Sequence, residues 1–134
     1  MRSAMQQVWS FLVPYLAVGL AGSAGSILRY IVGTVSGRVF GTGFPIGTFI
    51  INISGCLILG WFTEVIRYRM VVTDTVRVAV AVGFVGAYTT FSTFCFESNS
   101  LLSDGSEIKA LVNLIGSVVV GLIAVRLGIG LARS

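Results

Sequence analysis

Residues 83–97, GFVGAYTTFSTFCFE, combine hydroxyl side chains with phenyl rings in a stretch that has no charge before its last residue. Hydroxyl groups donate hydrogen bonds, and the edge of a phenyl ring carries partial positive charge. The two rings of the TTFSTF segment, Phe91 and Phe94, are three residues apart and would point the same way on a helix. This pattern favours noncovalent contact with a small anion, without a fixed counter-charge.

Further polar side chains recur at helical spacing elsewhere in apolar segments. Thr48, Asn52 and Cys56 follow one another at four-residue steps and share a helix face, as do Asn113, Ser117 and Gly121. An amide inside a hydrocarbon span must find a partner or a water-filled cavity. For Asn52 an interhelical hydrogen bond, worth about 0.6 kcal/mol, and a functional role both stay open. The polar groups expected at membrane depth are Thr48, Asn52, Thr89, Thr90, Ser92, Thr93, Asn113 and Ser117.

The same inventory argues against an enzyme. The chain has no histidine, which excludes histidine-based acid–base catalysis, and its two cysteines, Cys56 and Cys95, show no CxxC spacing. Conduction of an anion requires binding that is neither too weak nor too strong. Ring edges contribute about 0.5–1.5 kcal/mol, whereas ion desolvation costs on the order of 20 kcal/mol, so several hydroxyl and amide donors and water must share the load.

Composition sets the environment of these residues. The 134-residue chain is 55% hydrophobic and 10% charged, with mean hydropathy +0.96, so it is expected to be an all-α membrane protein. Four uncharged runs approach the ~20 residues that cross a bilayer. The first run is longer than the hydrophobic region of a cleaved signal peptide, the alternative for that segment. Residues 1–134 therefore read as one membrane domain, with spans at about 11–32, 46–66, 75–100 and 107–127.

Local signals shape these spans. Four hydroxyl residues compete with helical hydrogen bonding, and glycines precede them, so the third span should be interrupted near Gly86 to Thr89. Small residues in LAGSAGS of the first span predict close helix packing. Residues 33–44 read as a glycine-rich connection leading to Pro45, which suits the first turn of a helix. Arg29 could reach the membrane interface or face a polar vestibule.

The net charge of +4 reads as anchoring and topology, not nucleic-acid binding. Five arginines are expected on the side of the N-terminus and two basic residues opposite, which favours a cytoplasmic N-terminus. The five are Arg2, Arg67, Arg69, Arg77 and Arg133, and the two are Arg38 and Lys109.

Three segments, TTFSTF, GTFIINISGCLILG and AGSAGSILRY, together resemble the Fluc (CrcB) fluoride channels, and the resemblance covers essentially all four spans. It implies a multi-pass protein of a bacterial inner membrane that exports fluoride passively and confers resistance. It also implies an antiparallel, dual-topology homodimer with two pores. Loss of fluoride efflux from liposomes is then expected for Phe91→Ile or Asn52→Asp.

The resemblance also implies residue roles. Phe91 and Phe94 would line the pores with their ring edges toward fluoride, Asn52 and Thr48 would lie along the pathway, and Arg29 would serve a vestibule. A sodium ion at the dimer centre would be held by the backbone carbonyls of Gly86 and Thr89. The remaining pathway residues would be Thr90, Ser92, Thr93, Asn113 and Ser117.

Two features depart from the family pattern. Ala87 follows Gly86 where a glycine pair is common, and the five-to-two charge bias exceeds what dual topology predicts. Two other functions are compatible with a small four-span protein. A small proton-coupled multidrug transporter needs a buried carboxylate, but the first span has none, and Glu64 and Glu97 lie toward span ends. A non-transporting assembly subunit is the third reading.

Overall fold

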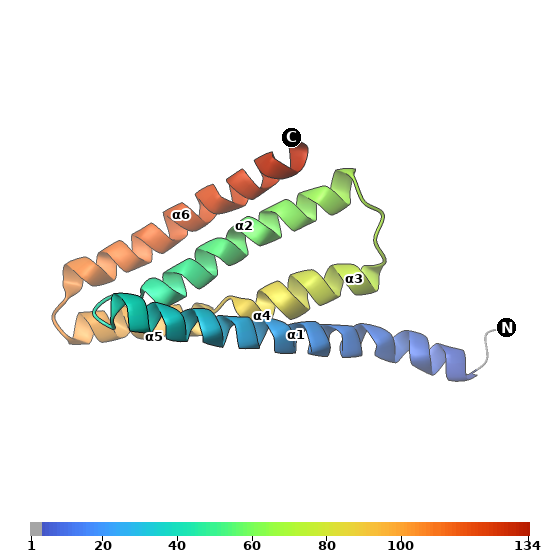
Figure 1. The fold of residues 1–134 in the computed structure, drawn as a ribbon, viewed down its shortest axis with the longest axis horizontal. Helices are drawn as coiled ribbons and strands as arrows, with labels where there is room; N and C mark the ends of the chain where they lie inside the picture. The colour runs from blue at the N-terminus through green and yellow to red at the C-terminus, as the bar shows by residue number, and fades with distance from the viewer. Residues whose placement is uncertain (1–3) are drawn as a thin grey trace.

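The computed structural model describes residues 4–134, which form helices joined by short turns (Figure 1). Four stretches are long and apolar enough to cross a membrane, which confirms the expected all-α architecture. The third is divided into several helical segments. In chain order the elements are α1 (Ala4–Phe40), α2 (Ile46–Tyr68), α3 (Asp74–Val78), the π-helix η1 (Ala79–Val85), α4 (Gly86–Tyr88), α5 (Phe91–Ser103) and α6 (Glu107–Arg133).

The first helix is longer than predicted. At 37 residues α1 spans about 55 Å, well beyond the hydrocarbon core of about 30 Å. The expectation that residues 33–44 form a connection is wrong for most of that stretch, because α1 continues to Phe40. This part of α1 packs closely on α2, because a Cβ on Gly47 of α2 would lie 3.3 Å from the Ser36 Cβ. The turn proper begins at Gly41, whose φ of +75° is in the left-handed region.

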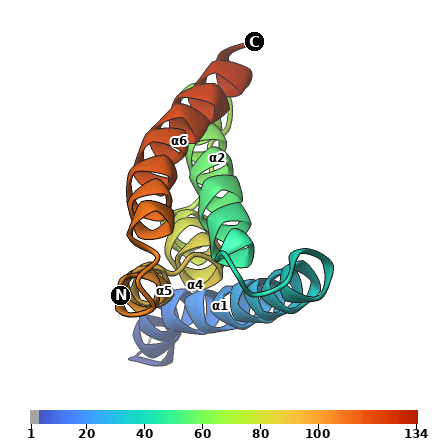
Figure 2. The ribbon, with the colours of Figure 1, turned by 90° about the vertical axis from the view of Figure 1, so that its left-hand side faces the viewer.

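Glycines also set the helix pairs. Helices α2 and α6 run side by side (Figures 1 and 2), and a Cβ on Gly60 would lie 2.5 Å from the Val125 carbonyl oxygen. Across the other pair, a Cβ on Gly25 of α1 would collide with the Phe84 carbonyl, while Gly83 of η1 faces Val18. The small residues of the first span therefore do provide close approach, although Gly19 faces open space within the protomer.

The third span is interrupted, as predicted, but at Thr89 and Thr90. Thr89 (φ −78°, ψ 160°) and Thr90 (φ −149°, ψ 115°) are extended, whereas Gly86 is helical (φ −63°, ψ −36°). The interruption thus overlaps only the last residue of the predicted region. Both threonines have negative φ angles, which any residue can adopt, so the break does not require glycine.

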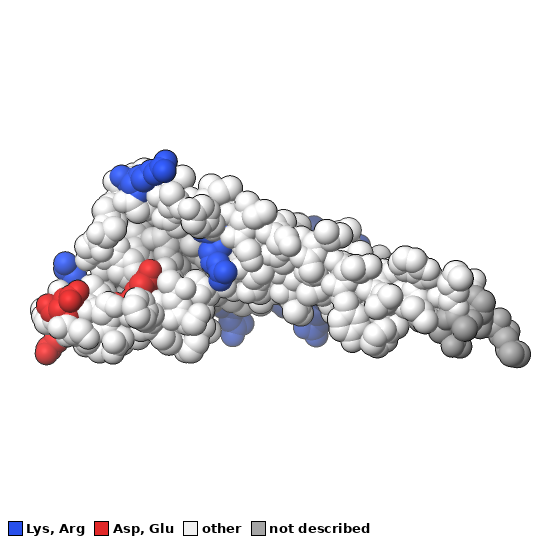
Figure 3. Space-filling model, turned by 90° about the horizontal axis from the view of Figure 1, so that it is seen from below, with Lys and Arg blue, Asp and Glu red and all other residues white. Residues whose placement is uncertain are grey.

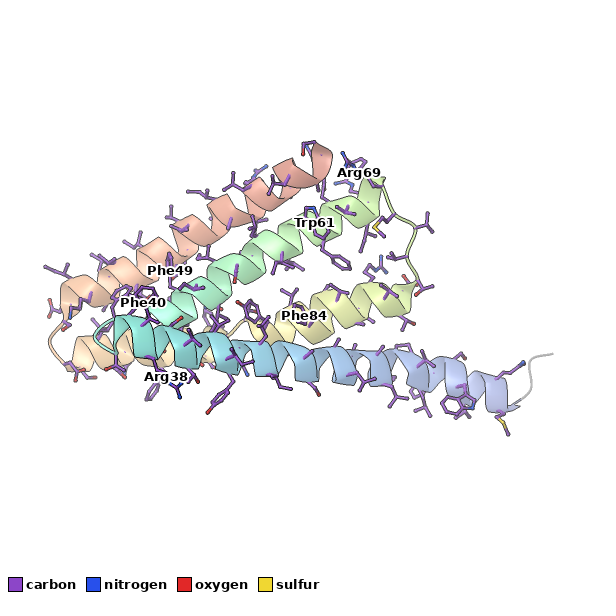
Figure 4. The ribbon with its side chains drawn as sticks, in the orientation of Figure 1. Arg38, Phe40, Phe49, Trp61, Arg69 and Phe84 are labelled. Carbon is purple, nitrogen blue, oxygen red and sulfur yellow. The ribbon has the colours of Figure 1, made fainter. Side chains whose placement is uncertain are left out.

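Charges gather at the two ends of the molecule. Figure 4 shows Arg38 near one end and Arg69 at the other, where α2 leads into α3. Arg133 pairs with Glu64 at that second end (N···O 2.5 Å). Lys109 Nζ, at the first end, donates to the Gly43 carbonyl (3.3 Å). The distribution follows the sides predicted from the sequence, except that Arg2 lies outside the described residues.

Candidate ion pathway at the helix break

A single side chain of α2 bridges the break in the third span. Asn52 Nδ2 donates to the Thr90 carbonyl (3.1 Å), and Asn52 Oδ1 accepts from the Thr90 N–H (2.9 Å). The Thr90 N–H, which would donate to the Gly86 carbonyl in a continuous helix, donates to Asn52 instead, and the Thr90 carbonyl gains a side-chain donor. Extended backbone inside a membrane requires such partners, so Asn52 fixes both the position and the conformation of the break.

The neighbouring Thr89 is held from two other helices. Its hydroxyl donates to the Val85 carbonyl (3.0 Å), and its carbonyl accepts from Arg29 Nη1 of α1 (3.4 Å). Gly55 of α2 is buried against it, and a Cβ there would collide with Thr89 Cγ2. Helices α1 and α2 therefore both converge on the break.

Beyond the break, Thr90 caps α5. Its hydroxyl oxygen accepts from the Thr93 N–H (3.3 Å) and lies 2.9 Å from Thr93 Oγ1. An extended residue whose side chain accepts from the third backbone N–H is a standard helix N-cap. The density of hydroxyls in TTFSTF is thus partly explained by capping.

A polar hollow of about 500 Å³ opens beside the break. Its lining includes the Arg29 guanidinium, the Glu97 carboxyl and the hydroxyls of Thr48, Thr90 and Thr93. An adjoining hollow of about 300 Å³ shares Thr48 and Glu97 with it and extends to the turn between α1 and α2. Figure 3 shows basic and acidic side chains around the hollowed part of the face seen from below. These hollows lead from one end of the molecule to the break.

A third hollow, of about 260 Å³, lies on another side of the break. It is lined by Asn52, Thr89, Thr90 and Phe91, together with apolar residues of α2 and η1. Thr90 borders both the 500 Å³ and the 260 Å³ hollows. The extended backbone therefore lies between a hollow lined by charged and hydroxyl side chains and a smaller, mostly apolar hollow that contains the Asn52 amide.

The two phenyl rings differ in environment. Phe91 is 78% exposed and lines the smaller hollow, whereas Phe94 is only 8% exposed. Their ring centroids lie 6.0 Å apart with planes inclined at 41°. Among the described residues around the break, Ser92 is exposed and lines neither hollow.

The polar residues predicted on the fourth span lie in a separate buried cluster. Asn113 is 2% exposed, and its Nδ2 donates to Ser98 Oγ (2.9 Å). Ser117 Oγ donates to Asn113 Oδ1 (3.5 Å), and Ser98 Oγ donates to the Phe94 carbonyl (2.7 Å). The structure thus brings Asn113 and Ser117 to the backbone of Phe94, not to the hollows lined by Arg29 or Asn52.

Two residues of this site were not predicted. Glu97 lines the polar hollow, interacts with the Thr48 side chain, and has one buried carboxyl oxygen, Oε2, without a hydrogen-bond partner among the described residues. Ser98 joins α5 to Asn113. The spacing of Glu97, four residues after Thr93, could have placed it on the same helix face.

The break also leaves backbone carbonyls available for a cation. The Gly86 carbonyl would accept from the Thr90 N–H in a continuous helix, but that N–H donates to Asn52. The Thr89 carbonyl accepts a long bond from Arg29 (3.4 Å). Two carbonyls suit a hard cation by chemistry but are too few for a complete site, so the donor set fits sodium only if another copy contributes more.

Comparisons with known proteins show the family of this chain. Residues 16–129 match the family model described as "CrcB-like protein, Camphor Resistance (CrcB)". A protein of Chloroflexus aurantiacus named "Fluoride-specific ion channel FluC" is 47% identical over 118 residues, which cover 88% of this chain and 94% of the relative. Proteins with the same name from Maridesulfovibrio salexigens (40% identical, 89% and 94% covered) and a Synechococcus strain (42% identical, 92% and 95% covered) also match. The protein with this interrupted third span therefore belongs to the CrcB family.

Proposed function

We propose that this protein is a passive, fluoride-selective ion channel that lets fluoride leave the cytoplasm. The observation that carries the proposal is the break at Thr89 and Thr90, where hydroxyls, an amide and a phenyl ring border two hollows at membrane depth. The names of its relatives, which are fluoride-specific channels, support the choice of ion. Transport of this kind requires no covalent chemistry, so the proposal does not include an enzymatic reaction.

Fluoride would exchange part of its water shell for protein donors. Desolvation of a small ion costs on the order of 20 kcal/mol, so one weak contact is insufficient. Thr48 and Thr93 hydroxyls and the Arg29 guanidinium line the larger hollow and can donate. At the smaller hollow the Asn52 amide and the Phe91 ring take over, while retained water contributes the remaining hydrogen bonds.

Opposite charges in the larger hollow would keep binding moderate. Arg29 attracts an anion, and Glu97 repels it from the same lining. A channel must bind its ion weakly enough to release it. The Glu97 carboxyl thus offsets the guanidinium, which alone would hold fluoride too firmly.

The functional unit would be an antiparallel homodimer with two pores. Phe91 is 78% exposed in the protomer, although we assign it to the pathway, so a second copy is needed to enclose its ring. A dyad between antiparallel copies would bring two pairs of Gly86 and Thr89 carbonyls together. These four oxygens would hold a sodium ion. The ion would supply a fixed positive charge and would join the helix breaks of the two copies through noncovalent coordination.

The same proposal places the protein in the inner membrane of a bacterium, in both orientations. The four membrane-capable helices and the bacterial relatives support a multi-pass location there. The comparisons do not favour the rival multidrug transporter, since the matching relatives are named as fluoride channels. No observation on this chain favours the assembly-subunit reading.

Ion efflux from liposomes containing the purified protein tests the proposal. A fluoride electrode should record rapid fluoride loss after the membrane potential is clamped with a potassium ionophore. Chloride-loaded liposomes should retain their chloride over the same period. A folded protein that releases neither ion, or both equally, would contradict the proposed function.

A further inference from the structure

The buried hydrogen bonds between α5 and α6 suggest a role that the proposed pathway does not explain. They form a directional series in which Ser117 donates to Asn113, Asn113 donates to Ser98, and Ser98 donates to the Phe94 carbonyl. Ser98 and Asn113 are 3% and 2% exposed. Neither side chain lines the hollows beside the break.

Ser98 is the central member of this series. A serine in a helix commonly donates to the carbonyl four residues earlier, which is a local bond that joins nothing else. Here the same hydroxyl also accepts from an amide on another helix. The bond therefore links the backbone at Phe94 to α6, because one oxygen is shared by both interactions.

The location of this link matters because it lies on α5 shortly after the break. Its backbone begins at Phe91, directly after the extended Thr89 and Thr90. The Asn52 bonds fix the break itself. The Ser98–Asn113 bond fixes α5 two turns later, so Phe94 lies between two anchors on different helices.

We propose that Ser98 is a positioning residue, which with Asn113 sets the rotation and height of α5 and thereby the placement of the Phe94 ring beside the ion pathway. The proposal rests on the proposed fluoride conduction. It assigns Asn113 to holding α5 in register, instead of to direct contact with the ion. Ser117 supports Asn113 through its amide oxygen.

Flux measurements on Ser98→Ala, Asn113→Ala and the double variant test this role. Ser98→Ala leaves the buried Asn113 amide without its acceptor, and Asn113→Ala removes the side chain that joins Ser98 to α6. Each single variant should therefore slow fluoride efflux about tenfold. The double variant should be no slower than either single variant, because both remove one link. Ser98→Thr retains the hydroxyl and should restore efflux.

A matched control is available on the same helix. Ser103 Oγ donates to the Asn99 carbonyl (3.0 Å) in the same local geometry, but Ser103 is exposed. Ser103→Ala should therefore leave fluoride efflux unchanged. Each variant is first shown by size-exclusion chromatography to be folded and in the same assembly as the unsubstituted protein. If Ser98→Ala does not fold, Ser98→Cys, whose thiol is a weak donor, should show the same slowing.

A spectroscopic readout separates positioning from a general structural effect. The carbonyl carbon of Phe94, labelled with ¹³C, should change its NMR shift in Ser98→Ala and return in Ser98→Thr. Normal efflux in Ser98→Ala, or additive losses in the double variant, would overturn the proposal. Absence of efflux from the unsubstituted protein would instead contradict the proposed function, so the two failures are distinguishable.

Discussion

Asn52 is the residue on which the local geometry of the site depends most directly. Its amide satisfies both backbone groups of Thr90, at 3.1 and 2.9 Å, inside a span where water cannot do so freely. Sequence reasoning left an interhelical hydrogen bond and a functional role as alternatives for this residue. The structure contains this hydrogen bond, which stabilises the break at the candidate site. A structural bond and a functional role are therefore compatible for Asn52.

Replacement of Asn52 by aspartate tests this dependence. The carboxylate cannot donate to the Thr90 carbonyl, and its charge would face the path of an anion. We expect fluoride efflux from liposomes to fall at least tenfold, since a lost buried donor alone costs about 1–3 kcal/mol. Thr63→Ala serves as control, because the Thr63 hydroxyl donates within α2, to the Leu59 and Gly60 carbonyls. Equal efflux from Asn52→Asp and the unsubstituted protein would contradict the assignment.

Arg29 and Glu97 allow a test in which two neutral substitutions have opposite effects. Both line the 500 Å³ hollow, and glutamine retains hydrogen-bonding capacity at either position. A unit charge about 10 Å from the ion, at an effective dielectric constant of about 20, contributes about 1.7 kcal/mol, or roughly tenfold. Arg29→Gln should therefore slow fluoride entry by up to that factor, and Glu97→Gln should accelerate entry at fluoride concentrations so low that entry, not release from the hollow, limits efflux.

The salt dependence provides the check on this pair. Raising the impermeant salt concentration should shrink both effects, because electrostatic attraction and repulsion are screened. If both substitutions slow efflux alike at every salt concentration, Glu97 has a role other than repulsion. Its buried and unpartnered Oε2 would then be the starting point for a different explanation.

At the scale of elements, close contacts of α1 with η1 position the break. Gly25 is buried against the backbone of Phe84, and a Cβ at this position would collide with that carbonyl. The segment that it contacts is a π-helix, a form that often occurs at functional sites. The same Cβ on Gly25 would lie 3.1 Å from the backbone nitrogen of Tyr88, the last helical residue before the break.

A pair of alanine substitutions in α1 tests this packing. Gly25→Ala should destabilise the protein by about 1–3 kcal/mol, the usual cost of overpacking, and should slow fluoride efflux because the break is displaced. Gly19→Ala introduces a Cβ with no heavy atom within 4 Å in the protomer. It should be neutral, or gain up to about 1 kcal/mol from helix propensity. Thermal unfolding in detergent would measure both; equal melting temperatures would argue against the contact.

The helices also show which structural features could be predicted from the sequence. Four spans, the interruption of the third and the glycine packing of the first follow from composition and local pattern. The exact break did not, because Asn52 lies 38 residues from Thr90 and no local rule links them. Nor did the continuation of α1 to Phe40, where packing on α2 outweighs the low helix propensity of glycine.

For the whole molecule, the distribution of charge bears on how the chain inserts. The basic residues at the end of α2 and at the C-terminus lie opposite those near the α1–α2 turn (Figure 4). An excess of Lys and Arg in the cytoplasmic loops sets the orientation of most membrane proteins. The proposed antiparallel dimer requires chains of both orientations, so it predicts that the five-to-two bias is too small to impose one.

Labelling of single cysteines at the two ends decides between one orientation and two. Cys56 and Cys95 are first replaced by alanine, and cysteine is then introduced as Ser134→Cys at the C-terminus or Thr42→Cys in the α1–α2 turn. A membrane-impermeant maleimide applied to spheroplasts should label about half of each variant if insertion is dual. One variant labelled almost fully and the other almost not at all would show a single orientation. An antiparallel pair could not form from such a population, and the two-pore dimer would have to be abandoned even if fluoride efflux were normal.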